Sequence, residues 1–174
     1  MTPTALVLEA ATLEDLTALV ALEALCHSHP WSPGGLRDAI VPVAGEGSVL
    51  VLRAPWTPPD EHRGIRAYCA VQVVVGEAHV HNLAVLPEAR RHGLARRLLT
   101  LTLEMAARKG ARAAHLEVRA GNSAARALYR AMGFLEVGKR PAYYSAPVED
   151  AILLSRADLG GAGPTNLERP SSKC

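Results

Sequence analysis

A short basic stretch that contains a glycine is the part of the sequence whose residue types point most directly to chemistry. It reads Arg90-Arg91-His92-Gly93-Leu94-Ala95 and follows an apolar segment, residues 80–86, that predicts a strand. Pro87 interrupts the segment, and a helix is expected to begin near Gly93. Backbone N–H groups in the first turn of a helix lack partners within the helix, and the helix dipole adds positive charge there. The stretch therefore predicts a site for an anion such as a pyrophosphate, which glycine allows the backbone to approach closely.

Alternating strands and helices must position this site. The expected strands span residues 6–9, 48–53, 65–75, 80–86, 112–118, 134–138 and 151–156. The expected helices span residues 12–26, 32–41, 93–110 and 122–132. Thr12, Ser32 and Asn122 are expected to cap helices, because their side-chain oxygens can accept hydrogen bonds from the first turn. Strands that alternate with helices in the middle of the chain, with hairpins at either end, predict a mixed sheet covered by helices.

A second stretch gives the glycine motif a context. Arg-x-x-Gly-x-Ala at residues 90–95 resembles the acetyl-CoA loop of the GNAT superfamily of N-acetyltransferases, and residues 116–134, LEVRAGNSAARALYRAMGF, resemble the strand and helix that follow it there. More narrowly, the chain resembles the bacterial ribosomal-protein-alanine N-acetyltransferases in His29-Pro30-Trp31-Ser32, Tyr143-Tyr144 and Glu149-Asp150-Ala151-Ile152. These segments occur in the expected order over roughly the first nine-tenths of the chain, which random motif matches rarely do.

The resemblance implies a fold and an activity. The fold is α/β, the GNAT fold, with a mixed and mostly antiparallel sheet of about seven strands and about four flanking helices. Its parallel fourth and fifth strands splay apart, and acetyl-CoA lies in the gap. The implied enzyme is an acetyl-CoA-dependent N-acetyltransferase that modifies the N-terminal α-amine of a protein, in the subfamily the N-terminal alanine of a small-subunit ribosomal protein. We expect residues 1–158 to form this domain and residues 159–174, rich in Gly, Pro and Ser, to form a disordered tail.

Glu117 and Tyr129 are the candidate catalytic residues. An N-terminal amine, with a pKa of about 8, needs only mild base assistance at neutral pH. Strand alternation puts His115, Glu117 and Arg119 on one face, and the resemblance gives Glu117 the role of base, acting through a water. It makes Tyr129 the acid for the leaving thiolate, since a phenol with a pKa of about 10 is protonated at neutral pH. Each residue has a structural alternative: Glu117 can pair with Arg119 or Arg97 on the sheet surface, and Tyr129 can fill the core.

The resemblance also gives candidates for cofactor binding, including the strand that supplies a backbone N–H to the thioester carbonyl. They are Leu83, Ala84, Val85, Arg90, Arg91, His92, Gly93, Leu94, Ala95, Arg96 and Asn122. The arginine doublets at 90–91 and 96–97 are expected around the CoA phosphates, with at least one of the four arginines simply solvated. Capping of a helix explains Asn122 equally well.

Aromatic residues are the candidates for acceptor binding. Trp31, Tyr143 and Tyr144 resemble residues of the subfamily's peptide groove, although aromatic side chains can also close the edge of a core. Two segments depart from the subfamily, the turn at residues 145–148 and the proline-rich segment at residues 55–59. They leave the acceptor open between a protein N-terminus and a small amine such as a polyamine or an aminoglycoside. A non-catalytic acyl-CoA-binding module is a third possibility, but it would need neither Glu117 nor Tyr129.

Composition limits the partners. The 174 residues carry a net charge of +2, with 19 basic and 17 acidic residues spread along the chain, which argues against strong nucleic-acid binding. The three cysteines form no Cys-x-x-Cys pair, so we expect a reducing compartment and no zinc site. The histidine pairs 27/29 and 79/81 lack an evident third ligand, so no metal is expected. Without a signal peptide or a membrane-length apolar run, the sequence predicts a cytoplasmic monomer that does not engage a membrane.

Overall fold

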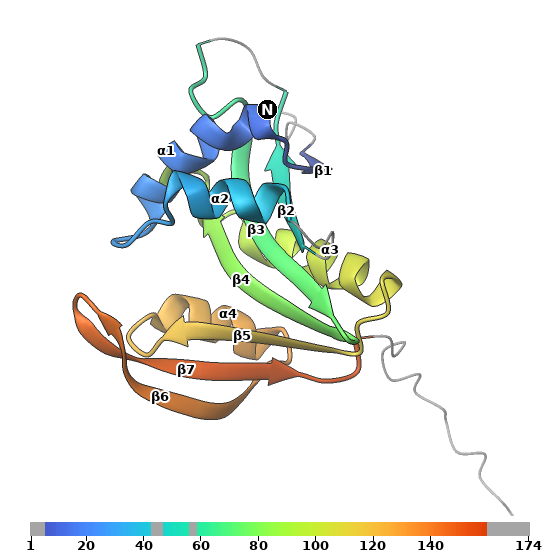
Figure 1. The fold of residues 1–174 in the computed structure, drawn as a ribbon, viewed down its shortest axis with the longest axis vertical. Helices are drawn as coiled ribbons and strands as arrows, with labels where there is room; N and C mark the ends of the chain where they lie inside the picture. The colour runs from blue at the N-terminus through green and yellow to red at the C-terminus, as the bar shows by residue number, and fades with distance from the viewer. Residues whose placement is uncertain (1–5, 43–46, 56–58, 160–174) are drawn as a thin grey trace, which may run out of the picture.

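A mixed sheet organises the chain. The computed structural model describes residues 6–42, 47–55 and 59–159, and in these ranges it contains a seven-stranded sheet of order β1-β2-β3-β4-β5-β7-β6 (Figure 1). The strands are β1 (Val7–Ala10), β2 (Gly47–Arg53), β3 (Ile65–Val74), β4 (Glu77–Val85), β5 (Ala113–Arg119), β6 (Leu135–Ser145) and β7 (Val148–Arg156). Neighbouring strands are antiparallel except for β4 and β5. The expected mixed, mostly antiparallel sheet with a parallel pair is confirmed.

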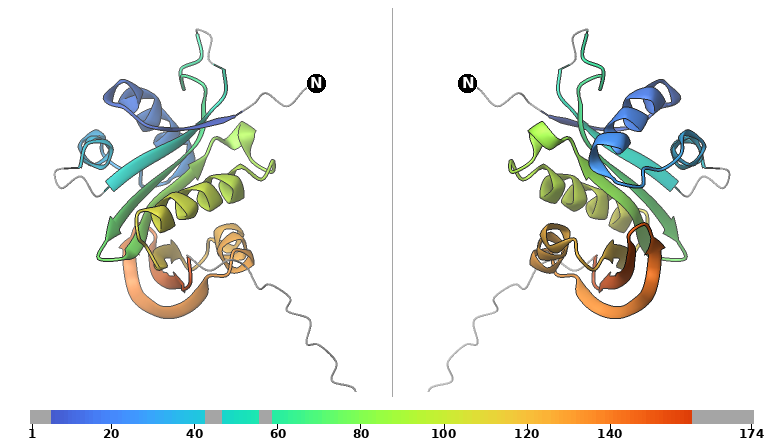
Figure 2. Two further views of the ribbon diagram at one scale, coloured as in Figure 1. Left: turned by 90° about the vertical axis from the view of Figure 1, so that its right-hand side faces the viewer. Right: turned by 90° about the vertical axis from the view of Figure 1, so that its left-hand side faces the viewer.

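Helices cover both faces of the sheet. The α-helices of the described ranges are α1 (Leu16–Cys26), α2 (Pro33–Ile40), α3 (Leu94–Arg108) and α4 (Ser123–Ala131), and short 3₁₀ turns lie at Leu13–Asp15 and Pro87–Ala89. The views in Figure 2 place α1 and α2 on one face of the sheet and α3 and α4 on the other. Two of the expected caps bind the first turn directly, since Ser32 Oγ accepts from the Gly35 N–H and Asn122 Oδ1 accepts from the Ala125 N–H, each at 3.1 Å. None of these helices is long and apolar enough to cross a membrane.

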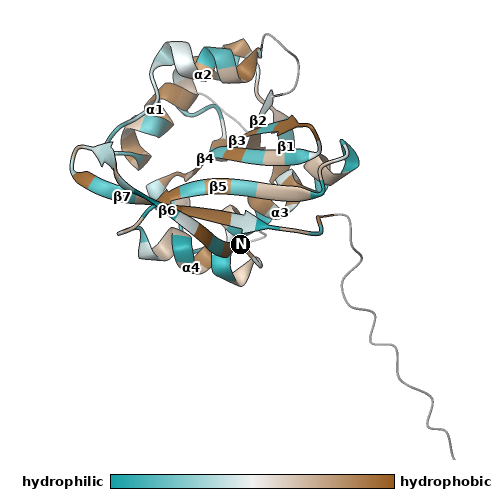
Figure 3. Ribbon diagram, turned by 60° about the horizontal axis from the view of Figure 1, so that its bottom comes forward, coloured by the Kyte–Doolittle hydropathy of each residue, from teal (hydrophilic) through white to brown (hydrophobic). Residues whose placement is uncertain are grey.

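Each face of the sheet has its own apolar core, because side chains alternate between the faces along a strand. Figure 3 shows this alternation of hydrophobic and hydrophilic residues along β5. On the α3 and α4 side, Leu98, Leu103 and Phe134 pack against alternate residues of β3, β4, β5 and β7. On the other side, Leu19 and Leu22 of α1 lie in a second cluster that is confined to β2, β3 and β4. The face of β5 that points away from α4 therefore remains outside this second core.

The parallel pair opens at a defined point. The pairing of β4 with β5 runs from Glu77 opposite Ala113 to Val80 opposite Leu116 and then stops. On its other edge β4 carries a β-bulge, because Val80 pairs with Val71 of β3 whereas the next paired residue, Asn82, is opposite Ala70. Bulges bend a strand and increase its twist. The bulge therefore lies where β4 turns away from β5, and Figure 1 shows the two strands diverging.

The observed elements differ from the expected ones mainly at the C-terminal hairpin. β6 extends to Ser145, well beyond the expected end at residue 138, and β7 begins at Val148 rather than at residue 151. Most of β6 is exposed as an edge strand, so the sequence there shows no apolar alternation. Its pairing is irregular between Arg140 and Tyr144, which accommodates Pro141 at the sheet edge, where proline is tolerated.

Two expectations fall wholly or partly outside the described ranges. Of the proline-rich segment, residues 56–58 are not described. The same holds for residues 160–174 of the expected tail, whereas Leu159 donates its N–H to the Arg112 carbonyl at 3.0 Å.

Candidate active site

A cavity of about 540 Å³ lies at the N-terminus of α3, beside the part of β4 that has no β5 partner. We call it the donor cavity, because it collects all of the predicted cofactor-binding residues except His92. Its lining includes Leu83, Ala84, Val85, Arg90, Arg91, Gly93, Leu94, Ala95, Arg96 and Asn122. His92 is exposed nearby, with Nδ1 at 3.4 Å from the Ala89 carbonyl. Because β5 is absent here, the free edge of β4 presents unpaired backbone groups towards the gap.

The backbone of the basic stretch explains its sequence. Gly93 is the N-cap of α3 with φ of 74°, and Arg91 also has a positive φ of 68°. Glycine adopts this left-handed conformation without a steric penalty, and the turn leaves the first N–H groups of α3 directed outward. Arg90 Nε donates to the Val85 carbonyl at 3.1 Å, which fixes the loop against β4. Arg97 does not line the cavity, and its guanidinium donates to the Leu6 carbonyl at 2.9 Å.

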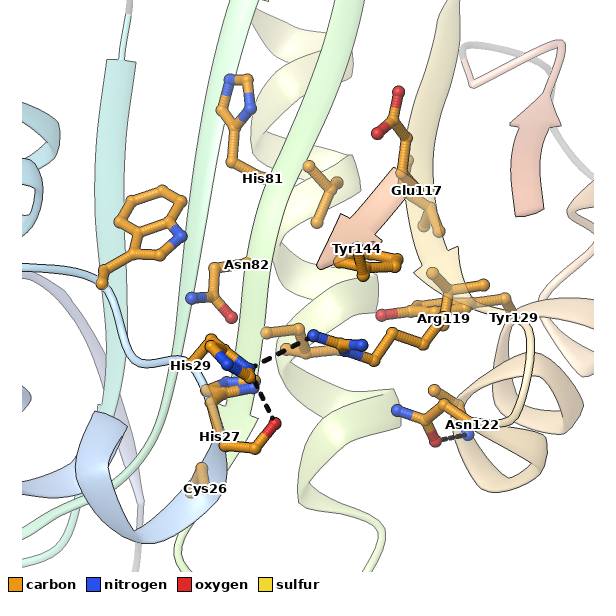
Figure 4. Close-up of a pocket in the computed structure, with 17 residues that line it drawn as sticks. Cys26, His27, His29, His81, Asn82, Glu117, Arg119, Asn122, Tyr129 and Tyr144 are labelled. Carbon is orange, nitrogen blue, oxygen red and sulfur yellow. Dashed lines mark hydrogen bonds between the residues drawn. The ribbon is translucent and has the colours of Figure 1, made fainter. Parts of the chain in front are cut away.

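A second cavity, of about 420 Å³, continues from the donor cavity into the gap between β4 and β5 (Figure 4). This central cavity shares Leu83, Asn122 and Tyr129 with the donor cavity. Tyr129 is only 8% exposed, and its ring packs edge-on against Phe134 with ring centroids 5.8 Å apart. Burial raises the pKa of Tyr129 above its ordinary value, so the phenol is protonated at neutral pH. The structure therefore brings a buried proton donor to the junction of the two cavities.

Glu117 lies across the central cavity, on the first β5 residue beyond the parallel pairing. Its carboxylate is 3.2 Å from Arg140 Nη1 of β6. The alternative prediction, a pair of Glu117 with Arg119 or Arg97, is wrong. Arg119 binds Glu149 at 3.2 Å, and Arg97 binds the Leu6 carbonyl. Sequence alone did not predict the Arg140 pair, because it depends on the unexpected extension of β6.

A third cavity, of about 650 Å³, extends the central cavity along the open face of β4, β5 and β6. This outer cavity is lined by all of the predicted acceptor-binding aromatics, Trp31, Tyr143 and Tyr144, and it shares Trp31, Tyr144 and Glu117 with the central cavity. The two tyrosine rings meet edge-on with centroids 5.1 Å apart, and the Arg119 guanidinium stacks on the Tyr144 ring at 4.0 Å. A continuous path thus leads from the donor cavity past Tyr129 and Glu117 to an open groove.

Glu23 lines none of the three cavities but holds residues that do, a role that the sequence did not reveal. Its side chain is fully buried in α1, yet it accepts hydrogen bonds from the Trp31 N–H at 2.7 Å, from Asn82 Nδ2 at 3.0 Å and from the Tyr68 hydroxyl. His27 Nε2 lies 3.2 Å from the same carboxylate. A buried carboxylate is stable only with such donors around it. Glu23 thus joins β3, β4 and the segment after α1 into one wall of the central cavity.

The available signal for Glu23 was its place among the apolar positions of α1. It follows Leu22 and is four residues after Leu19, and both leucines are buried. A charged residue within an apolar helix face indicates a buried polar contact. The partners lie in other elements, so only the three-dimensional structure identifies them. Within the described part of the chain, no group of three or more His, Cys, Asp or Glu side chains is arranged to hold a metal ion.

These features define a class of protein. A splayed parallel pair, a glycine-led helix start that offers N–H groups to an anion, and a buried proton donor at the gap suit transfer of an acyl group from a phosphate-bearing carrier. The model of the acetyltransferase (GNAT) family matches residues 17–134, and the chain belongs to that family. It is accordingly an acetyl-CoA-dependent N-acetyltransferase with acetyl-CoA as the acetyl donor.

Individual relatives are more specific. The chain is 35% identical over 143 residues to the [ribosomal protein bS18]-alanine N-acetyltransferase of Salmonella typhimurium, an alignment that covers 81% of this chain and 90% of that protein. The crystal structure of the ribosomal-protein-S18-alanine N-acetyltransferase from Escherichia coli superimposes with a TM-score of 0.76 at 30% identity, over 95% of this chain and all of that one. Arabidopsis thaliana NAA60 in complex with acetyl-CoA has the same fold, with a TM-score of 0.79 at 15% identity over 88% of this chain and 98% of that one.

Proposed function

We propose that this enzyme acetylates the N-terminal alanine of ribosomal protein bS18 in the cytoplasm. The observation that carries the proposal is the open groove of the outer cavity beyond Glu117, which leaves room for a polypeptide to follow an amine placed in the central cavity. The names of the Salmonella typhimurium and Escherichia coli relatives support the same acceptor. We also propose that the enzyme acts on the protein N-terminus as a monomer, engages no membrane and does not bind nucleic acid strongly.

We assign each part of the reaction to residues around the gap between β4 and β5. The N–H groups at the start of α3, with Arg90, Arg91 and Arg96, hold the CoA phosphates, and the free β4 edge at residues 83–85 donates an N–H to the thioester oxygen. Glu117, through a water, accepts a proton from the attacking amine. Tyr129 gives its proton to the departing thiolate, which suits a phenol kept protonated by burial. Trp31, Tyr143 and Tyr144 hold the first residues of the acceptor.

Acetyl transfer to a panel of acceptors tests the proposal. The measurement is CoA release by the purified protein with acetyl-CoA and one of four acceptors. These are a bS18 N-terminal peptide that begins with alanine, the same peptide with a blocked N-terminus, spermidine and kanamycin. We expect turnover on the free peptide alone. Turnover on the small amines alone would show that the acceptor is a small amine and not a protein N-terminus. Binding of acetyl-CoA without turnover would favour a non-catalytic module.

A further inference from the structure

His81 occupies the bulge that opens the sheet. It is the extra residue of β4 between Val80, the last residue paired with β5, and Asn82. A bulge re-aims the side chain of its extra residue and is common beside active sites. Glu23 holds the next residue in place through the hydrogen bond from Asn82 Nδ2 at 3.0 Å. The position of the imidazole is therefore set by the same features that create the gap.

The His81 side chain borders the cavities in which the reaction is proposed to occur. His81 lines both the central and the outer cavity, as does Glu117 on the other side of the gap. Figure 4 shows His81 on β4 and Glu117 on β5. In the parallel register, Glu77 lies opposite Ala113 and His79 opposite His115, so His81 and Glu117 are the next positions along the two strands, just beyond the last paired residues. Both side chains therefore lie where the central cavity meets the outer cavity.

The surroundings of His81 favour a neutral ring that can accept a proton. Its Nε2 lies 3.4 Å from Gln72 Oε1 of β3, so a proton on Nε2 leaves the lone pair on Nδ1 free. Burial and the neighbouring His79 lower the pKa of His81, while the charge of Glu117 opposes the shift. The titratable or charged groups that share its outer cavity include His79 and Glu77 on β4, His115 and Glu117 on β5, and Arg140 and Tyr144 on β6.

An ordinary carboxylate is a weak base for this reaction. A carboxylate has an ordinary pKa of about 4.3, and the most effective base has a pKa near the operating pH. The Glu117 carboxylate also lies 3.2 Å from Arg140 Nη1, so part of its hydrogen-bonding capacity is already taken. An imidazole matches the operating pH far better, and His81 is the imidazole across the gap.

We infer that His81 is a catalytic base that removes the first proton from the α-ammonium group of the acceptor, while Glu117 receives the second. The inference rests on the proposed function, because it adds a proton acceptor at the same site.

The step balances as follows. The ammonium nitrogen gives one proton to Nδ1 of His81, and its lone pair forms the N–C bond at the thioester carbonyl. The C–S bond breaks, and the thiolate takes the Tyr129 proton. The second nitrogen proton passes to Glu117 and returns to the Tyr129 phenolate. The imidazolium releases the first proton to solvent, so one proton leaves for each amide formed.

A pH profile tests the inference. The measurement is kcat/KM for the acceptor between pH 6 and pH 9, for the wild type, His81→Ala and His81→Gln. If His81 accepts the first proton, the wild type uses the ammonium form. Its profile is then nearly flat up to about pH 8, the ordinary pKa of the α-amine, and the flat range begins no higher than about pH 6.5, because the pKa of His81 is lowered. Both variants depend on free amine, so their kcat/KM rises up to about tenfold per pH unit in this window. The deficit is therefore roughly 30-fold at pH 6.5, shrinks as the pH rises and is lost above about pH 8.

Chemical rescue and a second histidine sharpen the test. Added imidazole should restore part of the activity of His81→Ala at pH 6.5, and acetyl-CoA affinity should be unchanged. His62→Ala is the control, because His62 lines none of the three cavities, and it should show the wild-type profile without rescue. A deficit of His81→Ala that is constant with pH and not rescued, or no deficit, would overturn the inference. Turnover of the wild type on small amines alone would overturn only the proposed acceptor, because the pH profile of kcat/KM can be measured with that amine. Absence of any turnover would overturn both the proposed function and the role of His81.

Discussion

The donor cavity and the outer cavity are built in different ways. Most of the donor lining comes from two consecutive segments, residues 83–85 and 90–96, and the proposed contacts with acetyl-CoA there rely largely on backbone N–H groups. The outer cavity takes its side chains from the segment after α1 and from β4, β5, β6 and β7. A backbone site depends on local conformation, so a glycine and its neighbours predict it. A side-chain site depends on register between distant elements, which a single sequence does not state.

The largest expected effect is at Tyr129, where the donor cavity meets the central cavity. Tyr129→Phe removes the proton donor without changing the packing against Phe134, so we expect kcat to fall by about 10²-fold or more while acetyl-CoA still binds. Stopped assays of CoA release and calorimetric titration with acetyl-CoA measure the two quantities. Tyr143→Phe removes a hydroxyl that lines only the outer cavity and should lower kcat far less. Equal losses in both variants would contradict the role of Tyr129.

A smaller effect is expected on the acceptor side alone. Glu23→Gln replaces an oxygen that accepts hydrogen bonds with an amide that donates, which leaves one buried donor unsatisfied at a cost of about 2 kcal/mol. If the whole cost fell on acceptor binding, kcat/KM for the acceptor would drop roughly 30-fold. The affinity for acetyl-CoA should stay unchanged, because Trp31 and Asn82, which donate to Glu23, line the central cavity and not the donor cavity.

Glu104→Gln provides the matched control for that variant. Glu104 lies on the exposed face of α3, 4.0 Å from Arg108, and its loss should change neither stability nor activity measurably. A weakened acetyl-CoA affinity in Glu23→Gln would show that the two sides are coupled rather than separately built.

An effect of comparable size is expected on the donor side, where it falls on the affinity for acetyl-CoA. Gly93→Val forces a β-branched residue to φ of 74°, which costs about 1–3 kcal/mol, although a Cβ there meets no atom within 4 Å. We expect the affinity for acetyl-CoA to weaken by about tenfold as the loop rearranges. Gly110→Val carries the same strain at φ of 93° at the far end of α3. It should lose similar stability in thermal unfolding but keep its affinity, and a parallel loss of affinity would contradict a local backbone site.

The smallest effect separates the two interpretations of Asn122. Asn122→Ala removes the cap of α4, which costs about 1 kcal/mol and lowers the melting temperature by about 2–4 °C in a chain of this size. If capping is its whole contribution, acetyl-CoA affinity is unchanged, as in Ser32→Ala, which removes the cap of α2. A further loss of affinity in Asn122→Ala alone would add a cofactor contact.

The sequence predicted the elements that follow local rules. The strand before Gly93, the helix after it and the cap at Asn122 are confirmed, because periodicity and capping chemistry lie within a few residues. The predicted length of β6 was wrong, because an exposed edge strand that contains Pro141 has no apolar pattern. The contacts of Glu23 with Tyr68 and Asn82 span 45 and 59 residues, and no local signal encodes such pairings. The Arg140 partner of Glu117 escaped prediction for the same reason.

The free edge of β4 beyond Val80 affects how fast its backbone amide protons exchange with solvent. Amide protons that point into the gap have no β5 partner, whereas those that point to β3 lie in a paired ladder from Ala67 to Val74. Exchange of the gap-facing amides with deuterium is therefore limited by access to water rather than by opening of the sheet. Occupation of the gap by acetyl-CoA should slow their exchange, while the β3-facing amides of the same strand keep their rates. The difference between the two sets of β4 amides therefore reports whether acetyl-CoA is bound.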